Sequence, residues 1–257
     1  MSETELLYEI RDKAAWITIN RETKRNSLSM EIIDLFFDYL NRAATDDNVR
    51  VVCLTAVGDK TFCSGADLKS AAGAEGHVAG AKKYAELLKK MAAFSKPMVA
   101  RMNGNCLAGG LGFMLSCDLV YAKEEAKFGT PELNVGLFPM MIGALIFRNA
   151  SRKKALEMIY TGRMLSAAEA EQMGLITRAV PSDELDRVVN EAISAVAAKA
   201  PLAVKLGRQA LATAENMTLE NALDYLCEQL EAVASTEDAL EGMMAFVQKR
   251  QPQWKGR

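Results

Sequence analysis

Two turns rich in small residues and one loop acid could do chemistry together. The first turn is Phe62-Cys63-Ser64-Gly65-Ala66-Asp67-Leu68, and the second runs from Asn103 to Gly112. A backbone with little side chain in its way can point N–H groups at a ligand oxygen, and two such groups form an oxyanion hole. Glu132 follows in the loop Thr130-Pro131-Glu132-Leu133. Two donors and one carboxylate would be enough to enolise a thioester.

The elements around these turns must hold them in place, and each turn follows an apolar, strand-like run. Strands are expected at 51–55, 98–102 and 119–122, and a hairpin is expected from strands at 6–10 and 15–19. Helices are expected from a Ser29 cap to about Arg42, at about 81–94, and at about 110–117. The alternation of strand and helix predicts an α/β core.

Strands nearly vanish after about Pro139. Helices are expected at 145–160, 167–173, 182–199 and 203–248, with Pro201 marking a break. We therefore predict a core of residues 1–200 and a helical C-terminal region of residues 201–257. In that region Leu223, Leu226, Leu230 and Val233 recur at helical spacing. A lone domain would have to expose part of this apolar face, so we expect the chain to self-associate.

Composition excludes several classes of partner. The chain has 257 residues, a formal net charge of −2 and no polybasic run, so neither a nucleic acid nor an anionic membrane is expected as a partner. The acidic start of the chain argues against secretory and mitochondrial targeting, which predicts a cytoplasmic location. The chain has five cysteines, none in CxxC spacing, and a single histidine, so no metal site is expected.

That histidine, His77, lies in a small-residue stretch at 71–80 that we expect to be a mobile loop. A serine–histidine–aspartate triad would have to use His77. An exposed loop histidine is the simpler interpretation, and so we do not expect a triad.

The chain resembles the crotonase superfamily, the enoyl-CoA hydratases and isomerases, over nearly its full length. The matching pieces occur in order, at the family's spacing. They are Asn20-Arg21, 24–28, 62–69, Lys96-Pro97, Asn103-Gly104, 107–110, Cys117-Asp118, Phe128-Gly129, Pro131-Glu132, 136–139, Ala155, Thr161-Gly162, 168–170, Gly174-Leu175 and 246–250.

The resemblance implies a spiral core of repeated ββα units, a helical region that builds trimers or hexamers, and an acyl-CoA substrate. Coenzyme A would belong to the substrate, and no separate cofactor is expected. The N–H groups of Ala66 and Gly109 would form the oxyanion hole, and Glu132 would be the acid and base. The substrate would contact Arg25, Ser64, Asp67, Leu68, Lys69, Leu107 and Pro131, with Phe246 and Lys249 reaching the coenzyme A of a neighbouring subunit.

The chain departs from the hydratase pattern at one position. Two-glutamate hydratases carry a second acid three residues after the oxyanion glycine, where this chain has Gly112. A single carboxylate near an apolar acyl chain, with a raised pKa, favours double-bond isomerisation, whereas hydration is commoner in the family. A degenerate acyl-CoA-binding scaffold is the non-enzymatic alternative. A glutamate installed at position 112 is expected to favour hydration if the site tolerates a side chain.

Overall fold

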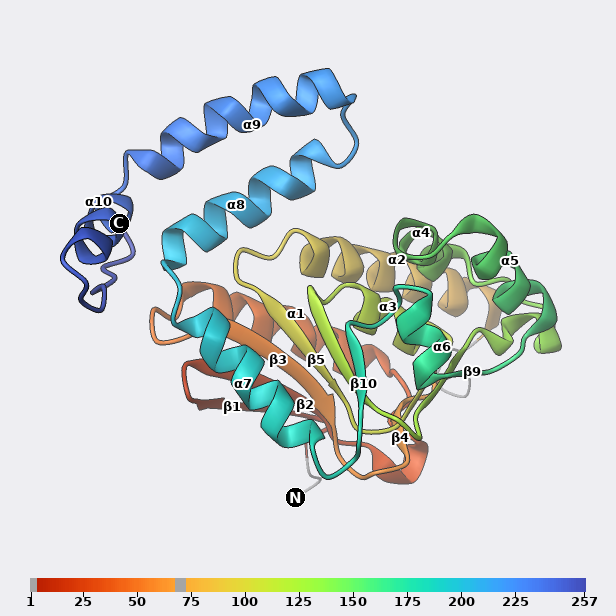
Figure 1. Ribbon diagram of the computed structural model, residues 1–257. Helices are drawn as coiled ribbons and strands as arrows, with labels where there is room; N and C mark the ends of the chain where they lie inside the picture. Colours follow the sequence, from red (N-terminus) through yellow and green to blue (C-terminus); the bar gives the residue numbers. More distant parts are fainter. Residues whose placement is uncertain (1–3, 68–72) are drawn as a thin grey trace.

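The computed structural model describes residues 4–67 and 73–257 and contains two β-sheets with helices on both faces of the larger one (Figure 1). The larger sheet has the strand order β1-β2-β3-β5-β7-β10. Its strands are β1 (Leu6–Arg11), β2 (Ala14–Ile19), β3 (Val51–Ala56), β5 (Met98–Met102), β7 (Leu119–Lys123) and β10 (Arg178–Val180). Strands β1 and β2 form the expected antiparallel hairpin, and the other pairs are parallel.

Alternating side chains give this sheet two buried faces. Trp16 and Cys53 pack against α7 (Leu185–Ala197), which crosses one face (Figure 1). Ile17 and Leu54 point to the opposite face and belong to the main core. The helices that contribute to this core include α1 (Met30–Thr45), α2 (Gly73–Ala92) and α3 (Gly109–Leu115). Burial of both faces explains why the strand sequences are almost continuously apolar.

The smaller sheet has the order β4-β6-β8-β9, from β4 (Thr61–Cys63), β6 (Asn105–Leu107), β8 (Lys127–Gly129) and β9 (Leu165–Ser166). Along the chain, β3-β4-α2 and β5-β6-α3 repeat one ββα order, with the first strand in the large sheet and the second in the small one. The predicted α/β class is therefore confirmed.

Three helices follow the core. They are α8 (Pro201–Ala214), α9 (Leu219–Ala234) and α10 (Glu237–Val247), and Figure 1 shows them reaching out from the sheets as an arm. Arg208 ties α8 to the core, because its guanidinium pairs with Asp118 at 2.9 Å and also donates to the carbonyl oxygen of Phe94. The division at residue 200 remains a prediction, although α8 begins at Pro201.

Several predicted boundaries are wrong. The stretch at 71–80 was expected to be a loop, but residues from Gly73 onward belong to α2. The single helix expected at 145–160 is two, α4 (Met140–Asn149) and α5 (Arg152–Thr161). The region 203–248 is three helices, because Thr218 and Thr236 cap new helix starts with their side chains. The remaining elements are α6 (Ala167–Gln172) and the short 3-10 helices η1 (Glu22–Lys24) and η2 (Pro131–Val135).

In the described part of the chain, no helix has both the length and the apolar character that crossing a bilayer requires.

Candidate active site

The three segments singled out by the sequence leave one edge of the small sheet. Strands β4, β6 and β8 are neighbours and run parallel. Ser64 to Asp67 follow β4, Ala108 and Gly109 follow β6, and Thr130 to Glu132 follow β8. The carboxyl ends of parallel strands meet at one edge, which is where open α/β sheets bind ligands. The topology therefore brings the two turns and the acid together.

The two predicted donors lie close to each other. A Cβ placed on Gly109 would be 3.8 Å from the nitrogen of Ala66, and one placed on Gly65 would be 3.3 Å from the nitrogen of Gly109. Within the described residues, neither the N–H of Ala66 nor that of Gly109 donates a hydrogen bond. Ala66 is exposed and Gly109 is half-buried. Two neighbouring N–H groups without an acceptor among the described residues thus lie side by side, as an oxyanion hole requires.

The turn before Gly109 is held in an unusual conformation. Ala108 has φ 49° and ψ −129°, a region of backbone space that residues with a side chain rarely adopt. Its N–H donates to the carbonyl oxygen of Gly129 at 3.0 Å, so β8 helps to fix the turn. Gly65 opposite has φ 94° and no room for a Cβ, which would be 2.7 Å from the Cβ of Ala108. Such strain persists where the surroundings over-determine the backbone, and it is typical of functional sites.

Glu132 has the environment of a proton acceptor. It lies in the 3-10 helix η2 and is half-buried. Its Oε2 atom is buried and has no hydrogen-bond partner among the described groups. Burial raises the pKa of this carboxyl, partly offset by a hydrogen bond with its own backbone. A buried oxygen without a partner costs free energy, and that cost makes the carboxylate a stronger base.

This burial predicts a stability difference that depends on pH. Because the pKa of Glu132 is raised on folding, its contribution to stability is full below the unfolded pKa of about 4.3 and is lost as the pH rises through the folded value. Glu132→Gln, whose amide cannot ionise, is therefore expected to melt at a higher temperature than the wild type at pH 8. The gap should narrow towards pH 5. Calorimetric melting curves across this range measure it.

Glu9→Gln is the matched control, since Glu9 is an exposed carboxylate on β1. It should leave the melting temperature nearly unchanged at every pH. A Glu132→Gln variant that melts below the wild type at pH 8 would contradict the conclusion that burial of the Glu132 carboxylate destabilises the folded protein.

Arg21 is a buried cation beside the first turn. It is 6% exposed, and its guanidinium contacts Glu5 at 2.7 Å and Asp67 at 3.0 Å. It also donates to the carbonyl oxygen of Ser27 at 2.6 Å. This buried cation anchors the residue next to Ala66. The signal was its place in the Asn20-Arg21 motif, but its partners are distant in sequence.

The predicted substrate contacts other than Asp67 fall into four pairs. Arg25 and Ser64 meet, because the N–H of Ser64 donates to the carbonyl oxygen of Arg25 at 3.2 Å. Arg25 is exposed, and Leu107 and Pro131 are half-buried beside the two turns. Leu68 and Lys69 lie outside the described residues. Phe246, 86% exposed, lies in α10 and Lys249 follows that helix, and Figure 1 shows α10 well apart from strand β4 of the small sheet.

Gly112 has no room for a side chain. It is buried in α3, and a Cβ there would collide with the hydroxyl of Tyr84 and lie 3.0 Å from Cγ2 of Ile142. Tyr84 belongs to α2 and is 7% exposed. The space that the resemblance assigns to a second glutamate is therefore filled by a tyrosine from another helix. Sequence reasoning missed Tyr84 because it falls on the apolar face of an amphipathic helix.

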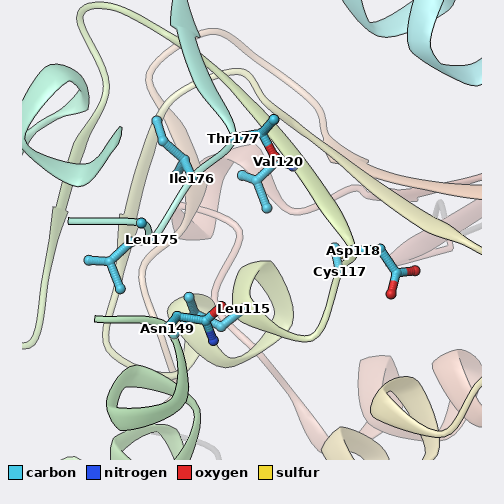
Figure 2. Close-up of a pocket in the computed structure, with 9 residues that line it drawn as sticks. Leu115, Cys117, Asp118, Val120, Asn149, Leu175, Ile176 and Thr177 are labelled. Atoms are coloured by element: carbon cyan, nitrogen blue, oxygen red, sulfur yellow. Dashed lines mark hydrogen bonds between the residues drawn. The ribbon is translucent and has the colours of Figure 1, made fainter. Parts of the chain in front are cut away.

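A separate small cavity of about 130 Å³ lies where α3 ends and β7 begins (Figure 2). It is too small for a typical ligand pocket of about 300–1,000 Å³. None of the candidate site residues lines it. Its lining residues are Leu115, Cys117, Asp118, Val120, Asn149, Gly174, Leu175, Ile176 and Thr177.

Comparison with proteins of known sequence identifies relatives along the whole chain. The sequence profile described as Enoyl-CoA hydratase/isomerase matches residues 9–257. The 2,3-dehydroadipyl-CoA hydratase of Escherichia coli (strain K12) is 32% identical over 255 residues, which are 99% of this chain and 100% of that protein. The (E)-benzylidenesuccinyl-CoA hydratase of Thauera aromatica is 32% identical over 250 residues, covering 96% of this chain and 98% of that protein.

Solved structures agree with the sequence comparison. An enoyl-CoA hydratase from Bacillus anthracis superposes with a TM-score of 0.95 at 32% identity, covering 98% of this chain and 100% of the other. The human enoyl Coenzyme A hydratase domain-containing protein 3 gives a TM-score of 0.94 at 29% identity, covering 97% and 100%. The crotonase-like fold expected from the sequence is confirmed. The chain thus belongs to the enoyl-CoA hydratase/isomerase family of the crotonase superfamily.

Proposed function

We propose that this protein is an enzyme that isomerises the double bond of an enoyl-CoA through a thioester enolate. The observation that supports this most is the pairing of two N–H groups, from Ala66 and Gly109, with one buried carboxylate oxygen on Glu132, all three without a hydrogen-bond partner among the described residues. The donors would stabilise negative charge on the thioester oxygen. Glu132 would carry the proton, and no metal or separate cofactor is needed for that step.

The proton balance of this reaction requires one base only. With a 3-enoyl-CoA, Glu132 would take a proton from C2, and the electron pair of that C–H bond would move into the enolate. The same carboxyl would return the proton to C4, while the C3–C4 double bond becomes a C2–C3 double bond. Nothing is oxidised or lost. The pKa of Glu132, raised by burial, suits a group that both takes and returns a proton.

Hydration is the second candidate, and the relatives support it. The curated relatives from Escherichia coli and Thauera aromatica are both hydratases by name. In this chain the water would have to be held by Glu132 and backbone groups, because Gly112 supplies no second carboxylate. We therefore rank hydration below isomerisation. The non-catalytic scaffold finds no support in these names.

Incubation with a panel of 3-enoyl-CoA and 2-enoyl-CoA thioesters of different chain length distinguishes these reactions. Isomerisation raises the ultraviolet absorbance as a conjugated 2-enoyl-CoA forms, whereas hydration of a 2-enoyl-CoA lowers it. We expect the 3-enoyl substrates to turn over faster. Faster turnover of the 2-enoyl substrates would favour hydration. Binding without turnover of either set would favour the non-catalytic acyl-CoA-binding scaffold.

We further propose that the chain assembles through its C-terminal arm into trimers or hexamers. Large apolar side chains are exposed along that arm, namely Leu211, Leu219, Leu223, Leu230, Leu240, Met243, Phe246 and Val247. Exposed apolar patches of this kind mark protein interfaces. In such an assembly Phe246 and Lys249 could meet the coenzyme A of a neighbour, as the resemblance implies.

Sedimentation is expected to give a particle of three or six times the 28.0 kDa chain mass. Leu223→Glu combined with Leu230→Glu should shift it towards the monomer, because each adds a charge to the apolar face. Leu7→Glu is a control, since Leu7 is exposed on β1, away from the arm. A stable wild-type monomer at micromolar concentration would count against this assembly.

A glutamate at position 112 was expected to favour hydration if the site tolerated a side chain, but the space around Gly112 is filled. Because a Cβ collides with Tyr84, both Gly112→Ala and Gly112→Glu are expected to destabilise the fold, by about 1–3 kcal/mol as for other overpacked cores. Urea unfolding measures this. Gly143→Ala is the matched control. Gly143 lies in α4, and apart from its own helix backbone no described residue comes within 4 Å of the position of an added Cβ, so alanine should stabilise the folded protein slightly. Equal stability of Gly112→Ala and the wild type would contradict the packing.

A further inference from the structure

Tyr84 reaches the reacting end of the candidate site from outside the three strand-end segments. Its hydroxyl donates to the carbonyl oxygen of Gly109. A Cβ placed on Gly109 would be 3.7 Å from that hydroxyl and 3.8 Å from the nitrogen of Ala66. The hydroxyl and one predicted oxyanion donor therefore border the same small space.

The backbone carbonyl that Tyr84 holds comes directly after a strained residue. Gly109 is the first residue of α3, directly after Ala108 with its positive φ. On the other side, the N–H of Ala108 is held by the carbonyl oxygen of Gly129. The short segment between Ala108 and the Gly109 carbonyl is thus fixed at both ends. The free N–H of Gly109 lies between these two hydrogen bonds, so its direction depends on both.

We propose that Tyr84 is a positioning residue of the oxyanion hole, whose hydroxyl holds the Gly109 carbonyl and thereby keeps the Gly109 N–H aimed at the thioester oxygen. The inference rests on the proposed function. It also gives a reason for glycine at position 112, because any side chain there would displace the tyrosine hydroxyl.

The surroundings of Tyr84 keep it a donor. The ring is buried and packs against Phe113, with ring centroids 5.7 Å apart. Burial and the nearby Cys63, Cys106 and Glu132 side chains hold the pKa of Tyr84 well above its ordinary value. The hydroxyl therefore keeps its proton while Glu132 gains and loses one, and it does not compete as a base.

Tyr84→Phe tests the role, because it removes the hydroxyl and keeps the ring. We expect kcat to fall about tenfold, the equivalent of one hydrogen bond of about 1.4 kcal/mol, with KM changed less than about twofold. Tyr39→Phe is the matched control. Tyr39 also donates to a backbone carbonyl, that of Leu6 at 3.2 Å, and packs against Tyr8 instead. It should leave both constants unchanged.

A vibrational spectrum of bound butyryl-CoA, isotopically labelled at its thioester carbonyl, gives a readout that a merely structural role would not move. Hydrogen bonds from the oxyanion-hole N–H groups to the thioester oxygen lower the carbonyl stretching frequency of the bound thioester. We expect a clear lowering in the wild type and in Tyr39→Phe, and a smaller one in Tyr84→Phe. Because butyryl-CoA has no double bond, the readout does not depend on which enoyl reaction the enzyme catalyses.

The outcomes separate the two claims. A wild type that binds butyryl-CoA without lowering the frequency overturns the proposed function itself. A full lowering in both the wild type and Tyr84→Phe overturns only the role of Tyr84. If Tyr84→Phe does not fold, fluorotyrosine at position 84 replaces it, since the fluorine strengthens the donor with little change of shape. The frequency should then fall at least as far as in the wild type, and a smaller lowering overturns the role.

Discussion

Glu132→Gln is expected to lower enoyl-CoA turnover by about 10²–10⁴-fold, the usual cost of losing a general base. Glutamine keeps the shape of the side chain, but its amide cannot take a proton from carbon. In the folded protein the Glu132 carboxyl has a buried oxygen with no partner among the described groups, so the loss of its basicity should show in kcat. Steady-state kinetics on the best substrate of the enoyl-CoA panel measures the effect.

Binding should separate this loss from a damaged site. Calorimetric titration with butyryl-CoA is expected to give nearly the same affinity for Glu132→Gln and the wild type, because the predicted coenzyme A and oxyanion contacts are untouched. Glu9→Gln should match the wild type in both binding and turnover. Full activity in Glu132→Gln would contradict the proposal that Glu132 carries the proton, and another acid would then have to be sought.

Gly109→Pro is expected to lower turnover by about a hundredfold or more, because proline has no N–H and one of the two donors is lost. The structure places Gly109 at the first position of α3, where a helix tolerates proline. The variant should therefore fold, although the preceding Ala108 is already strained. Turnover and a far-ultraviolet circular dichroism spectrum, measured together, check both halves of this expectation.

Arg152→Pro is the control for proline at a helix start. Arg152 is the exposed first residue of α5, and it belongs to neither of the two turns. This variant should keep most of the activity. Unchanged turnover in a folded Gly109→Pro would place the oxyanion hole elsewhere and overturn the assignment of both turns.

Local patterns predicted the elements that depend on local physics. The hairpin of β1 and β2 and the helix capped by Ser29 appear as expected, with the Ser29 hydroxyl accepting from the N–H of Ile32 at 3.1 Å. The start of α2 was missed because glycine and alanine give no apolar stripe. Thr218 and Thr236 are residue types that commonly cap helices, but the apolar spacing continues past them, and so the two helix starts were missed.

Only those parts of the site that lie on short continuous segments of the chain could be predicted from the sequence. The two turns stand out because each is rich in small residues and follows an apolar, strand-like run, and Glu132 stands out as an acid in a loop after a proline. That β4, β6 and β8 are neighbours in one sheet depends on tertiary structure, and no local sequence pattern predicts it. Arg21 and Tyr84 reach the turns from elements remote in sequence, and their roles depend on contacts with Asp67 and Gly109.

Exchange of the C2 protons of butyryl-CoA in deuterated water tests most directly whether Glu132 and the two N–H groups enolise a thioester. Mass spectrometry follows the exchange, which needs neither hydration nor isomerisation. The wild type is predicted to incorporate deuterium at C2, and Glu132→Gln is predicted to bind butyryl-CoA without doing so. Binding by the wild type with no exchange, or equal exchange by both proteins, would contradict the account.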